Sequence, residues 1–181
     1  MSESNNWPFD CKQISVANWQ QIDAAPKIWC EMTTAAKNEE QWIEFFFLPK
    51  LDSKVPPEIA KLLEVARGSM IYGWHFYPLL TLGIDQCWRI LETGVRIRCQ
   101  QLGIPTKKVT KKGKEINTNF DENITALSGR SIILEKNKTR WNAVRSLRNL
   151  ASHPERQSLY DPGQAQRILS LAVEILNDLF Q

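Results

Sequence analysis

The fold of this chain is decided by the stretch Arg145-Ser-Leu-Arg148-Asn149-Leu-Ala-Ser152-His153-Pro154. On a helix with about 100° per residue, Arg145, Asn149 and His153 fall on one polar stripe. A proline pushes the preceding residue out of the helical region, so the helix should end near His153. Arg148 lies on the edge of the apolar side, which is formed by Trp141, Val144, Leu147, Leu150 and Ala151. The stretch therefore predicts a helix with one core face and one polar face.

Helical patterns extend from this stretch in both directions, and no strand pattern competes with them. After it, Asp161-Pro162 predicts the start of a last helix, which is amphipathic to the end of the chain. Before and around it, we expect helices over residues 24–47 (in one or two pieces), 57–67, 78–103, 121–128 and 135–152. We expect Asp121 to cap the helix over residues 121–128. Short connections between the last helices predict an all-α fold: an antiparallel four-helix bundle over residues 70–181, with a helical N-terminal extension over residues 1–69.

The composition is that of an ordinary globular protein with one domain, or with a core and an extension. Of 181 residues, 43% are hydrophobic and 24% are charged, and the net charge of +3 permits an anionic partner. The first residues lack the basic and apolar parts of a signal peptide. The most apolar run, Met70 to Ile84, is shorter than the ~18 residues of a membrane span. We therefore expect a cytoplasmic protein with no membrane association.

The sequence lacks the motifs of several common kinds of binding site and active site. The chain has no glycine-rich nucleotide-binding motif and no G-x-S-x-G. The four cysteines, Cys11, Cys30, Cys87 and Cys99, show no paired spacing, so we expect reduced thiols and neither a zinc site nor disulfides. There are only two histidines, and His75 sits in an aromatic cluster that favours a structural role. We expect neither a metal nor a cofactor.

The other histidine, His153, lies where the helix dipole favours the imidazolium form. It is either a cap for the last carbonyls or a catalytic group that Asn149 orients. Arg148 needs a partner, and Glu92 on the long helix is the obvious candidate. Arg148 and His153 are about 140° apart around a regular helix, so they cannot converge on one substrate. Either the helix end unwinds, or a second copy of the chain supplies the missing group.

The pattern Arg148-Asn149-x-x-x-His153 resembles the R-x4–6-H motif of HEPN domains (higher eukaryotes and prokaryotes nucleotide-binding). The neighbouring Leu-Arg-Asn-Leu-Ala-Ser-His-Pro-Glu and the Tyr-Pro-Leu-Leu that opens the long helix are also similar to this family, and the resemblance covers residues 70–181. It implies a four-helix bundle that dimerises through its motif helices. It also implies a metal-independent endoribonuclease, of the kind found among toxins and antiviral defence proteins.

The resemblance implies a role for each residue of the motif. His153 would be the general base that takes a proton from a ribose 2′-OH, and Arg148 would stabilise the charge on the phosphoryl oxygens. Asn149 would orient the histidine or the phosphate, Glu92 and Ser152 would support the site, and Arg145 would bind substrate. The implied partners are RNA, a second copy, and an antitoxin or other defence-system protein.

The lysines of residues 103–119 allow two interpretations. This segment, GIPTKKVTKKGKEINTN, has almost no apolar content and predicts a loop. The loop is either a solvated connection or a surface that holds the RNA backbone near the cleft. In the second case Lys107, Lys108, Lys111 and Lys112 bind substrate, together with Lys114.

One departure from the family and one alternative function follow from the sequence. In the subgroup paired with a nucleotidyltransferase antitoxin, the motif continues His-x-Tyr, whereas here Pro154-Glu155 follows and the nearest tyrosine is Tyr160. Control through that tyrosine is therefore not expected.

The alternative is a catalytically silent HEPN-like module that only dimerises or binds a partner. Its partner surface would be the aromatic N-terminal extension, with Trp7, Trp19, Trp29 and Trp42, and the other role for most of these rings is packing in the core.

Overall fold

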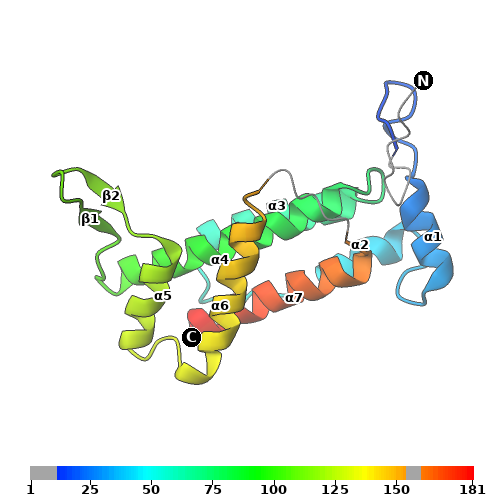
Figure 1. Cartoon of the computed structure of the whole chain (residues 1–181). Helices are drawn as coiled ribbons and strands as arrows, with labels where there is room; N and C mark the ends of the chain where they lie inside the picture. Colours follow the sequence, from blue (N-terminus) through cyan, green and yellow to red (C-terminus); the bar gives the residue numbers. More distant parts are fainter. Residues whose placement is uncertain (1–11, 154–159) are drawn as a thin grey trace.

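The computed structural model describes residues 12–153 and 160–181, so the predictions that concern Trp7, Cys11, Pro154 and Glu155 lie outside it. In the described residues helices predominate, which confirms the all-α prediction (Figure 1). The elements are α1 (Ala24–Met32), α2 (Glu39–Phe47), α3 (Pro57–Tyr72), α4 (Leu79–Gln101), β1 (Lys107–Val109), β2 (Glu115–Asn117), α5 (Phe120–Gly129), α6 (Glu135–Leu150) and α7 (Pro162–Leu179).

Helix α4 is the centre of the molecule, because it packs against α3, α5, α6 and α7. Its apolar stripe is fully buried, with Leu80, Ile84, Cys87, Leu91 and Val95 all at 0% exposure. In Figure 1, α3, α4 and α7 follow the long axis of the molecule, whereas α6 runs across α4 and α7. A Cβ on Gly94 would lie 2.9 Å from Leu176, so this glycine allows α4 and α7 to approach closely.

Helix α3 is longer than the sequence predicts, because it passes through Gly68 to Tyr72. The boundary expected between residues 69 and 70 therefore falls inside a continuous helix. Packing along α4 outweighs the roughly 1 kcal/mol by which glycine disfavours a helix. Trp42 of α2 is fully buried and its indole N–H donates to the Ile71 carbonyl at 3.0 Å, so the N-terminal helices share the core.

The predicted loop over residues 103–119 contains a β-hairpin, which corrects the expectation of no strands. Strands β1 and β2 are antiparallel, with Lys108 opposite Ile116 and Val109 opposite Glu115. Gly113 supports the turn with φ of +77°, a conformation that favours glycine. Strands of three residues are too short to give an alternating pattern, which explains the failure of the prediction.

None of the described helices combines the length and the apolarity needed to cross a membrane.

Candidate functional site

The candidate site lies at the C-terminal end of α6, where the helix tightens before it stops. The Ser152 N–H donates to the Asn149 carbonyl and the His153 N–H to the Leu150 carbonyl, each at 3.1 Å. Both bonds join residues three apart, which is the 3₁₀ pattern. The helix therefore ends just before His153, as predicted, and it tightens there instead of unwinding.

Arg148 is held by the partner that the sequence predicts. Its Nε donates to Oε2 of Glu92 on α4 at 2.6 Å, and its Nη1 donates to the Ser152 hydroxyl at 3.0 Å. Ser152 in turn donates to the Arg148 carbonyl at 3.1 Å. Within the described residues Nη2 of Arg148 has no hydrogen-bond acceptor, and the side chain is 32% exposed. The guanidinium is thus fixed on one side and open to an anion on the other.

Asn149 and His153, the other two motif residues, are both exposed at this end of the helix. Exposure leaves both side chains accessible to a ligand. The 3₁₀ turn advances each residue by about 120°, which rotates His153 further from Arg148 than the regular helix would. Helix geometry therefore predicts that the arginine and the histidine of one α6 face in different directions.

Arg145 forms an ion pair that the sequence did not predict, with Asp121 in the first turn of α5. Asp121 was expected to cap α5, but Asn119 is the cap. The Asn119 side chain accepts from the Glu122 N–H, and the Glu122 carboxylate accepts from the Asn119 N–H, each at 2.9 Å. This capping box leaves Asp121 free to bind Arg145. The predicted role of Arg145 in substrate binding therefore competes with a contact inside the chain.

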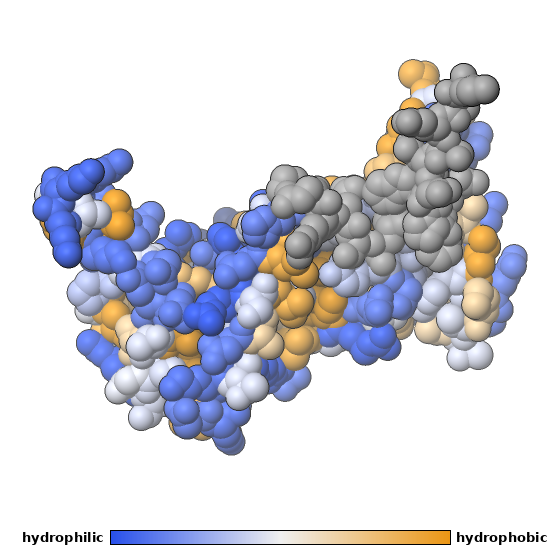
Figure 2. All heavy atoms as spheres, in the orientation of Figure 1, coloured by the Kyte–Doolittle hydropathy of each residue, from blue (hydrophilic) through white to orange (hydrophobic). Residues whose placement is uncertain are grey.

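The apolar side of α6 is only half buried, which corrects the predicted core face. Trp141 and Val144 are 4% and 2% exposed, but Leu147 and Leu150 are 38% and 39% exposed. The reason is that α6 runs across α4, so its C-terminal half extends past the core (Figure 1). Figure 2 shows hydrophobic atoms gathered beside α6 on this face of the molecule. Two leucines are thus exposed next to the charged motif.

The hairpin divides the predicted substrate-binding lysines into two that form ion pairs, Lys107 and Lys108, and two in its exposed turn, Lys111 and Lys112. Lys107 binds Glu115 at 2.5 Å, and the hydrogen bond to Glu115 raises the pKa of Lys107. Lys108 binds Glu122, and this bond lowers the pKa of the Glu122 carboxyl. Lys111 and Lys112 occupy the exposed turn between the strands.

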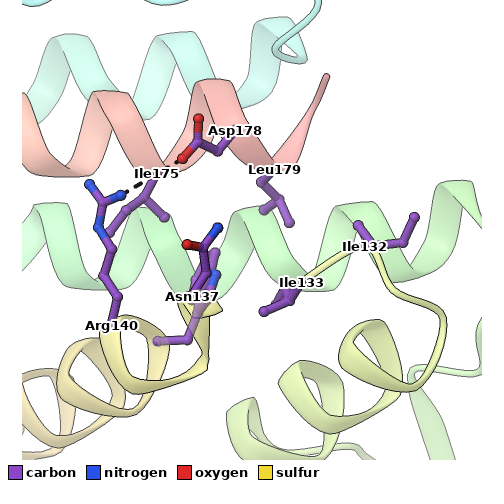
Figure 3. A pocket seen from close by; sticks show the side chains of 8 residues that line it. Ile132, Ile133, Asn137, Arg140, Ile175, Asp178 and Leu179 are labelled. Carbon is purple, nitrogen blue, oxygen red and sulfur yellow. Dashed lines mark ion pairs between the residues drawn. The ribbon is translucent and has the colours of Figure 1, made fainter. Parts of the chain in front are cut away.

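A pocket with an empty volume of about 290 Å³ lies beside the N-terminal half of α6 (Figure 3). Arg140 closes one side through ion pairs with Glu174 at 3.0 Å and Asp178 at 3.7 Å. The rest of the lining is mainly apolar, with Ile132, Ile133, Trp141, Ile175 and Leu179. This pocket belongs to the joint between α6 and α7, and the one carboxylate in its lining, Asp178, is paired with Arg140.

Residues 12–153 and 160–181 bring together no group of three His, Cys, Asp or Glu side chains that could hold a metal ion. The described cysteines, Cys30, Cys87 and Cys99, are free and buried. The polar groups at the end of α6 are the guanidinium of Arg148, the amide of Asn149, the hydroxyl of Ser152 and the imidazole of His153.

Comparison with protein-family models, with curated proteins and with solved structures gives no match for this chain. What the site does has to be inferred from its own residues.

Proposed function

We propose that this protein is a metal-independent endoribonuclease of the HEPN type, acting at an Arg/His site that two copies of the chain share. The observation that carries the proposal is the fixed guanidinium of Arg148. Glu92 and Ser152 orient it at a helix end where His153 and Asn149 are exposed. Cleavage of RNA at its 2′-OH requires at least a base, such as an imidazole, and a fixed cation that act on the same phosphate.

In this mechanism the neutral imidazole of His153 takes the proton from a ribose 2′-OH. The 2′-oxygen then attacks the adjacent phosphorus, and the bond from phosphorus to the 5′-oxygen breaks. The leaving oxygen takes a proton from an imidazolium or from water. Arg148 stabilises the charge that develops on the phosphoryl oxygens, and Asn149 orients the histidine or the phosphate. The products are a 2′,3′-cyclic phosphate and a free 5′-OH.

The geometry of α6 supports a site made by two copies. From the two short backbone bonds of the last turn, helix geometry predicts that Arg148 and His153 of one chain face in different directions. The exposed Leu147 and Leu150 supply an apolar contact surface beside the motif. A two-fold axis next to these leucines would set the Arg148 of one copy opposite the His153 of the other.

The test is to map the ends of RNA fragments after incubation with the purified protein, with and without EDTA. We expect cleavage of RNA but not of DNA, in EDTA as well as without it. Removing His153 or Arg148 should each lower the rate by about 10²-fold or more. A matched control is Arg96→Ala, because Arg96 is an exposed arginine on α4. Equal cleavage by His153→Ala protein would identify the activity as a contaminant.

A catalytically silent module that binds a partner is the second candidate. Exposed apolar side chains on the N-terminal segment and α1 favour it: Trp19 is 59%, Ile28 50% and Met32 80% exposed. This surface would contact an antitoxin or another defence-system protein. Absence of cleavage over a broad RNA panel, together with unchanged growth of cells that express the protein, would favour this candidate. Growth arrest that His153→Ala relieves would favour the toxin.

A further inference from the structure

The β-hairpin projects from the end of the molecule as a basic arm. Figure 1 shows β1 and β2 beyond α4 and α5, and Figure 2 shows the same projection as mostly hydrophilic. Five lysines and one glutamate give residues 105–118 a net charge of +4, although the whole chain carries only +3. In Figure 1 the arm and the C-terminal end of α6 point to the same side of the molecule.

The base of the arm is fixed to the body by hydrogen bonds. The Thr118 N–H donates to the Thr106 carbonyl at 2.9 Å, which closes the ladder. The Thr118 hydroxyl donates to the side-chain oxygen of Asn123 at 2.7 Å, and Asn123 is only 3% exposed. Lys108 adds its ion pair with Glu122 on α5. These contacts give the arm a set direction relative to α5, and Asp121 links α5 to α6 through Arg145.

The lysines at the tip are the ones available to a partner. Lys107 and Lys108 are engaged by Glu115 and Glu122. Lys111, Lys112 and Lys114 are exposed, and no carboxylate of the described residues pairs with them. Gly113 and the bond from the Thr110 N–H to the Lys114 carbonyl, at 2.8 Å, bring the three lysine residues into one tight turn.

The chemistry of the arm fits a polyphosphate backbone better than bases. Residues 103–119 contain no aromatic side chain, so the arm lacks the stacking surface that single-stranded nucleic acids need. An RNA duplex presents rows of phosphates along its grooves, and double-stranded RNA is recognised mostly by its shape and by contacts to these phosphates and to the 2′-hydroxyls. Lysines bind these phosphates as point charges without reading the sequence.

An anionic membrane would be the other polyanion, and the pattern of apolar residues disfavours it. Val109 is 70% exposed and Ile116 36% exposed, but the strand register puts them on opposite faces of the hairpin. Val109 shares its face with Lys107 and Glu115, whereas Ile116 lies opposite Lys108. The hairpin therefore has no continuous apolar face to insert into lipid.

We infer that the arm binds the phosphates of double-stranded RNA through Lys111, Lys112 and Lys114. This inference rests on the proposed function. Together they identify the substrate as an RNA in which a duplex adjoins the single-stranded cut site, as in a stem–loop. The duplex docks on the arm, and the unpaired nucleotides, whose riboses can turn for attack, enter the cleft at the end of α6.

The binding test uses the full chain with His153→Ala, so that cleavage cannot consume the probe. Fluorescence anisotropy would measure affinity for an RNA duplex of about 20 base pairs, longer than the ~16 that one double-stranded RNA module spans. The tip variant carries Lys111→Ala, Lys112→Ala and Lys114→Ala. The charge control carries Lys27→Ala, Lys54→Ala and Lys61→Ala, which removes the same charge from other exposed sites.

We expect the tip variant to lose about tenfold or more in duplex affinity, whereas the charge control keeps most of it. The slope of log affinity against log salt should fall by about 2–3 in the tip variant, since each lost phosphate contact removes roughly 0.7–0.9. Equal affinities of the two variants would overturn the inference. So would equal, tip-dependent binding of a single strand of the same length. Stronger tip-dependent binding to phosphatidylserine vesicles would replace duplex RNA with a membrane.

A second measurement separates this inference from the proposed function. The protein with His153 intact should cut a stem–loop faster than the same nucleotides rearranged without a stem, and the tip variant should lose that preference. Duplex binding without any cleavage would refute the proposed ribonuclease activity and support duplex binding by the arm. Cleavage that depends on neither the stem nor the tip lysines would refute the role of the arm and support the ribonuclease activity.

Discussion

Each arginine of the α6 motif already has a carboxylate partner, but the two pairs differ in what they leave open. Glu92 holds Arg148 through Nε, and Ser152 takes Nη1, so the guanidinium is directed from two sides. Asp121 holds Arg145 through a single Nη1 contact at the surface. Both pairs join α6 to another helix, but only the first arrangement holds the guanidinium from two sides.

Replacing these carboxylates one at a time tests that difference. We expect Glu92→Gln to lower RNA cleavage by about tenfold or more, because a misplaced catalytic group costs up to ~10²-fold. Asp121→Asn removes the other ion pair that an arginine of α6 forms, and it should leave the cleavage rate nearly unchanged. Both should cost about 1 kcal/mol or less in unfolding free energy, since the pairs are partly exposed. Initial rates and urea unfolding, measured on both variants, would show whether the loss of cleavage comes from the missing Glu92 carboxylate or from lower stability of the fold.

The buried cysteines give a second prediction at this scale. Burial raises the pKa of Cys87 to about 12 and also raises those of Cys30 and Cys99. Only the thiolate reacts, so these thiols should resist an aromatic disulfide reagent at pH 8 in the folded protein. In a Cys11→Ser background we expect fast labelling only after denaturant is added. Rapid labelling of the native protein would contradict the burial of Cys87.

Residue pairing was predictable only where burial demanded it. Arg148 and Glu92 both lie on the margin of an apolar stripe, and a charge in that position requires a counter-charge. Arg145 and Asp121 lie on exposed faces, where many partners are available and none is required. That pair depends on Asn119 taking the capping position, which the sequence did not distinguish from capping by Asp121.

At the scale of elements, the first turn of α5 connects the arm to the site helix. Glu122 completes the capping box of α5 with Asn119 and binds Lys108 of β1, and the neighbouring Asp121 binds Arg145 of α6. The sequence could not show this connection, because it predicted a loop where the hairpin lies. Long helices such as α4 and α7 were predictable from their apolar stripes and their proline starts, whereas three-residue strands carry no such pattern.

The pH dependence of the arm follows from Glu122. The bond from Lys108 and the Asn119 N–H lower the pKa of the Glu122 carboxyl below its ordinary 4.5 in the folded protein. A lowered pKa means that the carboxylate stabilises the fold above pH 4.5 and loses that effect as the pH falls through the lower folded value. We expect the protection factors for hydrogen exchange in residues 106–118, which correct for the intrinsic pH dependence, to fall over this acid range. Glu122→Gln should show the low protection already at pH 7, and a wild-type arm whose protection is unaffected by acid would contradict the anchor.

At the scale of the whole molecule, the exposed leucines of α6 predict self-association. We expect a dimer at micromolar concentration in sedimentation velocity. Leu147→Glu with Leu150→Glu should give a folded monomer that does not cut RNA, because both side chains are more than a third exposed and little core is lost. Val65→Glu with Leu82→Glu alters exposed apolar residues on α3 and α4 and serves as the matched control. A wild-type monomer, or a dimer that survives both leucine changes, would refute this interface.

Mixing two inactive proteins tests whether the site is shared between the copies. His153→Ala protein keeps its arginine and Arg148→Ala protein keeps its histidine. If each site takes Arg148 from one copy and His153 from the other, a mixed dimer holds one complete site. At equal concentrations half of the dimers are mixed and each has one of two sites, so about a quarter of the wild-type activity should return.

If both groups act from the same chain, the mixture stays as inactive as its components. The geometry of α6 predicts the first outcome, because its last turn carries His153 away from Arg148. Adding Leu147→Glu and Leu150→Glu to both proteins should abolish the recovery. Recovery that persists without the leucines would place the contact between the copies elsewhere on the chain.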